Sequence, residues 1–309
     1  MKPIISLFLN VDRTYIAVLE PGPKGLSLLY LESTKNPINL ELMDEDDMIV
    51  AASEISEIIP NFGLDYQTIN ITLPAESVMM SQIPGKTGIS NEQLKQLIAL
   101  EIRQSYPHFS FTDFTPRVIP FDPKKTGKHT MMAVIYSKND LKLCNELIKP
   151  LNRQMDNIEI SQFAAHTAFL YNYPEKANKT VVLLSIQSQF MDISLIENKK
   201  PIYYHLVSLQ GTKNIGQVVE DELPKLLAEQ VDKIDAVYLF GSGLTKENFM
   251  SAWESAMAMD IEAGRLNAFR MVSTNMTPRE REYCTRVGHI VAPCIGGALK
   301  QYHNIIRLN

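Results

Sequence analysis

The chain has 309 residues, of which 45% are hydrophobic and 21% charged, and it carries a formal net charge of −5. This is ordinary globular composition, and the length predicts about two domains with a sizeable core. The acidic balance, with no basic stripe to neutralise phosphates, disfavours nucleic acid as a partner.

The first half opens with a β-hairpin. Residues 4–10 and 14–19 are rich in β-branched and apolar residues and flank a short polar turn, which predicts two antiparallel strands. A third strand is expected at residues 26–33. An acidic segment then leads into a helix predicted at residues 46–59, and buried strands are expected at residues 68–73 and 78–83.

A compact α+β unit is predicted next. Ser90 and Gln93 form a capping box, which satisfies free amides at the start of a helix that ends at Pro107. Pro150 is expected to bend or shorten the last helix of this unit. The remaining expected elements are strands at residues 111–120 and 130–136, a polar turn at residues 122–129, and the helix at residues 139–154.

The second half repeats the pattern of the first. Its hairpin, at residues 181–197, is followed by a third strand, a helix and a buried strand that runs into Gly241 and Gly243. Thr277, Pro278 and Glu280 form a second capping box. The expected elements are helices at residues 161–171, 214–231 and 246–259, strands at residues 201–209 and 236–240, and a C-terminal helix entered through Pro293.

Several kinds of site and segment have no motif in this sequence. The six histidines are scattered, and no serine-hydrolase elbow or P-loop is present. Cys144, Cys284 and Cys294 form no CxxC pair, so we expect buried thiols in a reducing compartment. Residues 1–20 read as a strand rather than a signal peptide, and no run reaches the roughly 18 apolar residues of a membrane helix. The sequence therefore predicts a cytoplasmic protein.

The two hairpins, Leu7–Glu20 and Val181–Glu197, stand at equivalent places in the two halves. This layout resembles that of the actin, Hsp70 and sugar-kinase ATPases, whose hairpins hold the phosphates of ATP. The resemblance implies an α/β, actin-like (ribonuclease-H-like) duplicated fold with an inserted α+β subdomain. We predict a first half of domain I at residues 1–84, the insertion at 85–156, and domain II at 157–309 with its last helix returning toward domain I.

A more specific resemblance is carried by an ordered series of segments that covers nearly the whole chain. The series resembles the PilM family of actin-like type IV pilus assembly proteins, relatives of the cell-division protein FtsA, which share an insertion of this kind. The matching segments are the hairpin NVDRTYIAVLE ending at Glu20, the helix end Ala99–Phe109, the strand and helix of Met131–Leu151, the entry to the second half at Asn157–Leu170, the turn at Val237–Gly243, and the terminal Ala292–Leu299.

The hairpins depart from that family at the positions that would hold a nucleotide. In an Asp-x-Gly turn the aspartate holds hydrated magnesium, and the glycine lets the backbone approach a phosphate. Aligning Glu20 with the family's glutamate places Asn10 and Asp12 on these two positions, and Ser185 and Gln187 fall on them in the second hairpin. Both hairpins have therefore lost the metal ligand and the glycine.

Only the glycines of the adenosine-side turn, Gly241 and Gly243, persist. We therefore expect no cofactor and no catalytic residue, in a degenerate nucleotide cleft made by these six positions. The alternative is a functional ATPase that binds ATP and magnesium between the two halves, with Asp12 and Asp192 as the nearest carboxylates. A third possibility is a subunit of an actin-like polymer or ring.

The resemblance also implies partners and a location. Such proteins lie on the cytoplasmic side of the inner membrane, where they bind the short N-terminal segment of a single-span partner of the PilN type and connect to other pilus or secretion components. In the family the peptide docks beside the insertion. We expect the partner site among the apolar and aromatic residues available there, which are Tyr106, Phe109, Phe111, Phe114, Met131 and Met132.

Overall fold

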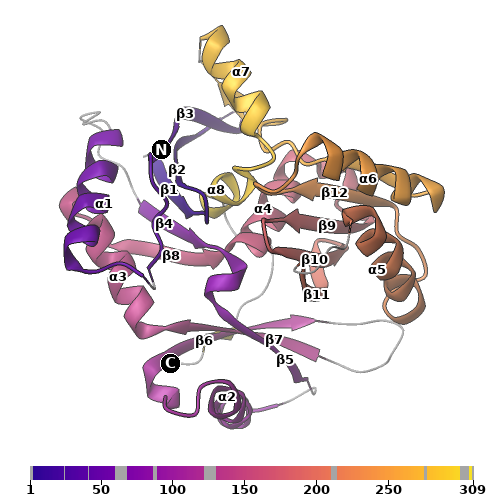
Figure 1. The fold of residues 1–309 in the computed structure, drawn as a ribbon, viewed down its shortest axis with the longest axis horizontal. Helices are drawn as coiled ribbons and strands as arrows, with labels where there is room; N and C mark the ends of the chain where they lie inside the picture. Colours follow the sequence, from indigo (N-terminus) through magenta and orange to yellow (C-terminus); the bar gives the residue numbers. More distant parts are fainter. Residues whose placement is uncertain are drawn as a thin grey trace.

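The computed structural model describes residues 3–23, 25–40, 42–59, 68–85, 89–121, 130–209, 214–274, 277–299 and 306–307. These residues form three sheets with helices packed between and around them (Figure 1). The predicted polar turn at residues 122–129 and the residues Gly211 and Thr212 lie outside the described part of the chain.

The first and second sheets share one topology. The first has the order β14-β3-β2-β1-β4-β8 and the second the order β11-β10-β9-β12-β13. In each, a three-stranded antiparallel meander is joined by two parallel strands, since β4 lies parallel to β1 and β12 parallel to β9. The repetition shows that the two halves are a duplicated unit.

The strands of the first sheet are β1 (Ile4–Leu9), β2 (Thr14–Gly22), β3 (Gly25–Ser33), β4 (Thr68–Leu73), β8 (Met155–Ile160) and β14 (Ser273–Thr274). Those of the second sheet are β9 (Thr180–Ile186), β10 (Phe190–Glu197), β11 (Lys200–Ser208), β12 (Ala236–Phe240) and β13 (Glu262–Arg265). The third sheet contains β5 (Met79–Pro84), β6 (Phe114–Phe121), β7 (Thr130–Ser137) and β15 (Ile306–Arg307).

The helices surround these sheets. α1 (Glu45–Ile58) and α3 (Lys138–Ile148) lie beside the first sheet, α5 (Ile215–Glu229) and α6 (Lys246–Ala258) beside the second, and α2 (Asn91–Ser105) beside the third (Figure 1). α7 (Pro278–Val287) projects at the far end from α2, while α4 (Ser161–Asn172) and α8 (Ala292–Gly297) lie between the first two sheets.

Local chemistry fixes the helix starts as the sequence predicted. At α2 the Ser90 side chain accepts from the Gln93 amide at 3.2 Å, and the Gln93 side chain accepts in return from the Ser90 amide at 3.0 Å. Thr277 and Glu280 make the same reciprocal pair at α7. These contacts satisfy amides that have no partner within the helix.

Several element boundaries differ from the predictions. β5, expected in the first half, pairs with β7 in the third sheet, because Ile83 packs with Leu94 and Ile98 of α2. The predicted boundary at residue 156 falls within β8, which pairs with β4 of the first sheet. The division of the sequence into three units stays a prediction.

Two further differences have local causes. β6 begins at Phe114 rather than at Phe111, because Ser110 and Asp113 cap a short 3₁₀ turn over residues 111–113. α3 ends at Ile148, because Pro150 follows it and lacks the amide hydrogen that a continuing helix would use.

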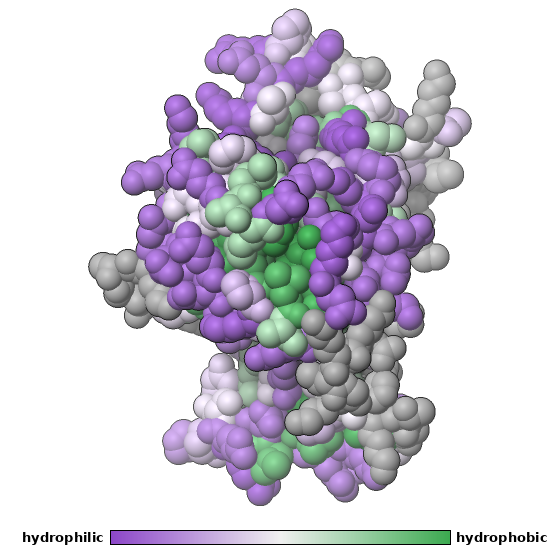
Figure 2. All heavy atoms as spheres, turned by 90° about the vertical axis from the view of Figure 1, so that its right-hand side faces the viewer, coloured by the Kyte–Doolittle hydropathy of each residue, from purple (hydrophilic) through white to green (hydrophobic). Residues whose placement is uncertain are grey.

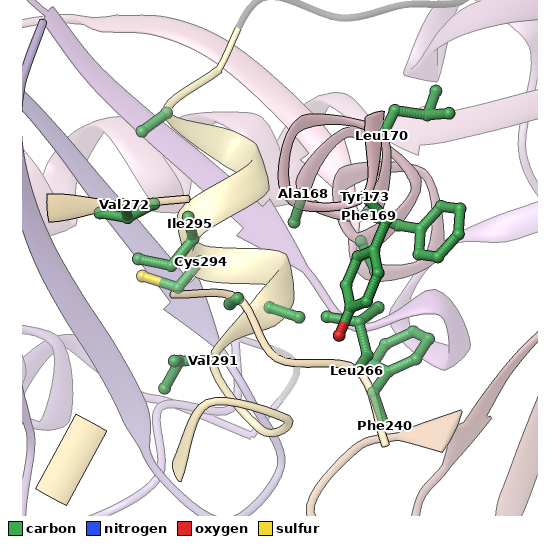
Figure 3. Close-up of a cluster of buried hydrophobic side chains, with 14 of the residues drawn as sticks. Ala168, Phe169, Leu170, Tyr173, Phe240, Leu266, Val272, Val291, Cys294 and Ile295 are labelled. Atoms are coloured by element: carbon green, nitrogen blue, oxygen red, sulfur yellow. The ribbon is translucent and has the colours of Figure 1, made fainter. Parts of the chain in front are cut away.

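The core between the two main sheets is formed where α8 meets α4. The thiol of Cys294 points toward the first sheet and donates to the Ser6 carbonyl at 3.3 Å, while Ala168 and Phe169 of α4 lie on the other side of α8 (Figure 3). A Cβ atom added at Gly296 would lie 1.8 Å from the carbonyl oxygen of Ala164. Only glycine therefore allows the two helices to pack this closely.

Replacing Gly296 should destabilise the protein strongly. In Gly296→Ala the new methyl group meets backbone atoms of α4 that cannot move aside, so the helices must separate. We expect a loss of about 3 kcal/mol in the free energy of unfolding, measured by urea denaturation. Gly22→Ala is the control, since its Cβ would lie 3.5 Å from the nearest backbone atom. Equal stability of the two variants would contradict the packing argument.

Candidate functional site

The tip of the first hairpin, at Asn10 to Arg13, follows the end of β1. The Asn10 amide donates to the Phe8 carbonyl at 2.9 Å, and the Asn10 side chain is 1% exposed. Its Nδ2 atom has no hydrogen-bond partner among the described residues. Asp12, two residues on, is exposed to solvent. The buried position therefore carries an uncharged amide, and the charged one lies outside the interior.

The tip of the second hairpin is tied down by its own side chains. Ser185 and Gln187 are both buried, and Nε2 of Gln187 donates to Oγ of Ser185 at 3.1 Å. The Gln187 amide closes the turn by donating to the Phe190 carbonyl at 2.9 Å. Polar groups that could face a ligand are thus used within the hairpin.

The glycine turn after β12 packs directly on this hairpin tip. Gly241 has a φ of +108°, and a Cβ there would lie 2.3 Å from the Ile186 carbonyl oxygen. A Cβ at Gly243 would lie 2.7 Å from the Gln187 carbonyl oxygen, and Oγ of Ser242 donates to Oε1 of Gln187 at 2.9 Å. Close contact with the protein's own backbone therefore accounts for both glycines.

These positions do not fit a magnesium-bound triphosphate. The turns of both hairpins lack the buried carboxylate that would hold the metal and the glycine that would admit a phosphate. The side chain of Gln187 bridges Ser185 and Ser242, where the glycine turn meets the second hairpin. Among the described residues, no group of three or more histidine, cysteine, aspartate or glutamate side chains could hold a metal ion.

The surroundings of Asp192 were not predicted from the sequence. It pairs across the hairpin with Ser185 and is fully buried, and its Oδ1 accepts a hydrogen bond from the Tyr204 hydroxyl. Burial raises its pKa to about 7, nearby Glu76 adds to the rise, and the Tyr204 and Ser185 hydroxyls oppose it. Its Oδ2 atom has no hydrogen-bond partner in the described part of the chain. An aspartate within a run of apolar residues, in a strand that is buried on both faces, was the signal.

The six expected partner residues do not form one surface. Phe114, Met131 and Met132 are buried, the first two against α2 and the third against the core of the first sheet. Their side chains are core residues, because β7 is covered on both faces, by α2 on one and by the core of the first sheet on the other. Tyr106 and Phe109 are 41% and 55% exposed, and Phe111 is half-buried.

Tyr106 and Phe109 make a small aromatic cluster with the edge of Phe114. Their three ring centroids lie 5.9 to 6.1 Å apart. The cluster lies just beyond the end of α2, on the third sheet's side of the molecule. Of the predicted partner site, this part remains accessible to another protein.

A groove between α1 and α3 offers a larger apolar surface. It has a volume of about 850 Å³, and Met48, Ala52, Leu143 and Pro150 are among its lining residues. Ile49, also in the lining, is 62% exposed. Charged side chains of both signs line it as well, namely Asp44, Glu45, Lys142, Glu146 and Lys149. An apolar groove with charges of both signs suits a short protein segment.

Apolar surface also gathers on the side of α5 and α6. Figure 2 views the molecule from this side and shows an apolar patch at the centre with hydrophilic side chains around it. α6 exposes Met250 and Met257 by 39% and 46%. Within the described ranges, every helix is too short or too polar to span a lipid bilayer.

The fold is that of the actin-like ATPases, as the sequence predicted. A chain of a PilM-PilN type IV pilus biogenesis complex is similar to it, with a TM-score of 0.72 and 14% identity over 96% of this chain and 97% of that one. A Bacteroides thetaiotaomicron protein with an actin-like ATPase fold and unknown function has a TM-score of 0.51 and 12% identity, over 85% and 90% of the two chains. No family model and no curated protein sequence matches.

The buried Asp192 should make stability depend on pH. Because its pKa is raised from 3.8 to about 7 in the folded protein, its stabilising neutral form is lost as pH rises through this window. Asp192→Asn carries no charge, so we expect it to be more stable than wild type at pH 8 by on the order of 3 kcal/mol, and similar at pH 4. Thermal unfolding at both pH values measures the difference.

Asp12→Asn provides the control for this measurement, because it removes the same charge from an exposed position of the first hairpin. It should leave the pH dependence of unfolding unchanged. If Asp192→Asn retains the wild-type slope between pH 4 and pH 7, Asp192 is not the group that titrates.

Proposed function

We propose that this chain is a cytoplasmic actin-like scaffold of a type IV pilus or related secretion machine. It binds the short cytoplasmic N-terminal segment of a single-span inner-membrane protein of the PilN type, and this partner holds it at the membrane. Other components of the machine bind to it in turn, and it works without hydrolysing ATP.

The observation that carries this proposal is the extent of the structural similarity. The likeness to a chain of the PilM-PilN complex covers nearly all of both chains, so it includes the third sheet and α2 as well as the duplicated halves. The third sheet is built from strands that pair with neither of the other two sheets. Its presence favours this kind of scaffold over a bare actin-like core.

The groove between α1 and α3 is the surface that we assign to the partner segment. It lies where the first sheet's helix α1 meets α3, which follows directly on β7 of the third sheet. The buried positions of Phe114, Met131 and Met132 remove half of the surface expected from the sequence. The groove offers an apolar lining in their place. Its methionines, such as Met43 and Met48, have flexible side chains that adapt to different partner residues.

The same proposal accounts for the residues found at the expected nucleotide-binding positions. A scaffold needs no metal ligand and tolerates Asn10 and Ser185 where an ATPase requires carboxylates. The bond between Gln187 and Ser242 ties the glycine turn to the second hairpin. The enzyme hypothesis would need these contacts to open and Asp12 to turn inward.

A charge in the groove should weaken binding of the partner segment. In Ile49→Glu a carboxylate replaces an exposed apolar side chain of the groove, so docking would bury a charge beside Met48 and Leu143. We expect at least tenfold weaker binding of the synthetic N-terminal segment of the PilN-type protein from the same organism, measured by calorimetry. The fold should be unchanged because residue 49 is exposed.

Met250→Glu is the matched control, since it makes the same kind of change at an exposed position of α6. Phe109→Ala tests the aromatic cluster at the end of α2. Normal binding by Ile49→Glu together with lost binding by Phe109→Ala would move the site to that cluster. Absence of binding to any variant and to wild type would reject the proposed partner.

Magnesium ATP should not bind. Calorimetry of the purified chain up to millimolar ATP with magnesium should give no binding heat and no shift in the unfolding temperature, because the hairpins lack the required ligands. Saturable binding would instead favour the ATPase, and Gln187→Gly, which opens the second hairpin tip, would then be expected to strengthen it.

A further inference from the structure

A second cleft lies where β11, an edge strand of the second sheet, meets the third sheet. It has a volume of about 400 Å³ and is bounded by Tyr203 and Tyr204 on one side and by Met80 and Met132 on the other. Glu76, which precedes β5, contributes the cleft's carboxylate. This cleft is separate from the groove between α1 and α3, since the two share no lining residue.

The cleft is acidic. Glu76 is half-buried, and burial raises its pKa. Asp192 pairs with Leu206 across the sheet and therefore points to the same side as Leu206 and Tyr204, both of which line the cleft. It is fully buried, and its Oδ2 atom has no hydrogen-bond partner in the described part of the chain. The carboxyl groups of Glu76 and Asp192 therefore lie in the same poorly solvated part of the cleft, where their negative charges repel each other.

The cleft lining supplies no lysine or arginine to offset these carboxylates. Arg117, on the same face of the third sheet, is committed elsewhere, because it donates to the Ile158 carbonyl and stacks on the Tyr136 ring. His205 is in the lining but is exposed. Buried carboxylates are stabilised by a paired cation, and tyrosine rings favour one nearby.

The edge of β11 is also only partly used. Its main chain pairs with β10 on one side, and on the other the Tyr204 carbonyl accepts from Nε2 of Gln82 at 2.7 Å. A side chain therefore occupies a position that a neighbouring strand would take in a sheet. Edge strands of this kind accept an extended peptide through their main-chain groups.

We propose that this cleft binds an extended segment of a partner protein, with one lysine or arginine side chain entering between Tyr204 and Glu76. The cation pairs with Glu76 and so reduces the repulsion between the Glu76 and Asp192 carboxylates. The segment's main chain lies along β11 and replaces Gln82 at the Tyr204 carbonyl, while its apolar side chains contact Met80 and Met132.

The test uses the full chain with methyl-labelled methionines and two peptides. One is the acetylated, amidated pentapeptide TVKVT, and the other has norleucine in place of lysine, which keeps the length and removes the charge. We expect the lysine peptide to shift the NMR signals of Met80 and Met132 saturably, and the norleucine peptide to bind at least tenfold more weakly. Glu76→Gln should weaken binding of the lysine peptide tenfold, while Glu20→Gln, at an exposed position of β2, should leave it unchanged.

Several outcomes would overturn the proposal. These are equal binding of the two peptides, an unchanged affinity of Glu76→Gln, and no shift at Met80 and Met132 at millimolar peptide. Shifts confined to Met43 and Met48 would place the peptide in the groove between α1 and α3 instead, and so would also overturn it. The result is independent of whether the PilN-type segment binds, because the two sites carry different methionines.

Discussion

The close contact between α4 and α8 determines how the two main sheets stand against each other. α8 lies on β1 and β4 of the first sheet, with Gly297 beside Thr72 and Ser6. α4 lies against its other side, and Gly296 removes the side chain that would hold the helices apart. These contacts join residues 292–297 to residues near the start of the chain, so the packing of the first sheet includes a helix that is distant in sequence.

Glycines also permit a close backbone approach at the turn after β12. Gly241 and Gly243 resemble the adenosine-side turn of a nucleotide-binding protein, yet each lets the turn approach Ile186 and Gln187. Packing alone therefore accounts for a glycine pattern that is typical of a ligand site. The same reasoning applies to Asn10 and Ser185, which are small and uncharged enough to be buried where a carboxylate would require a metal or a proton.

The sequence predicted the fold well because its signals were local. The periodicity of the hairpins, the capping boxes at Ser90 and Thr277, and Pro150 as a helix terminator depend on a few neighbouring residues each. The partner surface was predicted less well. From the sequence alone, Phe114 and Met132 could belong to an exposed face of the third sheet. The alternation of side chains along a strand does not reveal which of its two faces other elements will cover.

The surroundings of Asp192 could not be derived for a similar reason. Ser185, Tyr204 and Glu76 come from three separate elements, so their approach depends on how the sheets assemble rather than on spacing. The groove between α1 and α3 was also missed, because its walls lie about 100 residues apart in the sequence, at Met48 and Leu143. In both cases tertiary packing made the decisive contact.

α4 also has a mechanical consequence. It starts at Ser161, directly after β8 of the first sheet, and Gln162 and His166 then bond to Ser194 in the middle of the second sheet. A turn of one sheet relative to the other would have to break these buried bonds together with the packing at Gly296. These buried contacts therefore oppose a hinge rotation at α4, the helix that follows the first sheet and packs on the second.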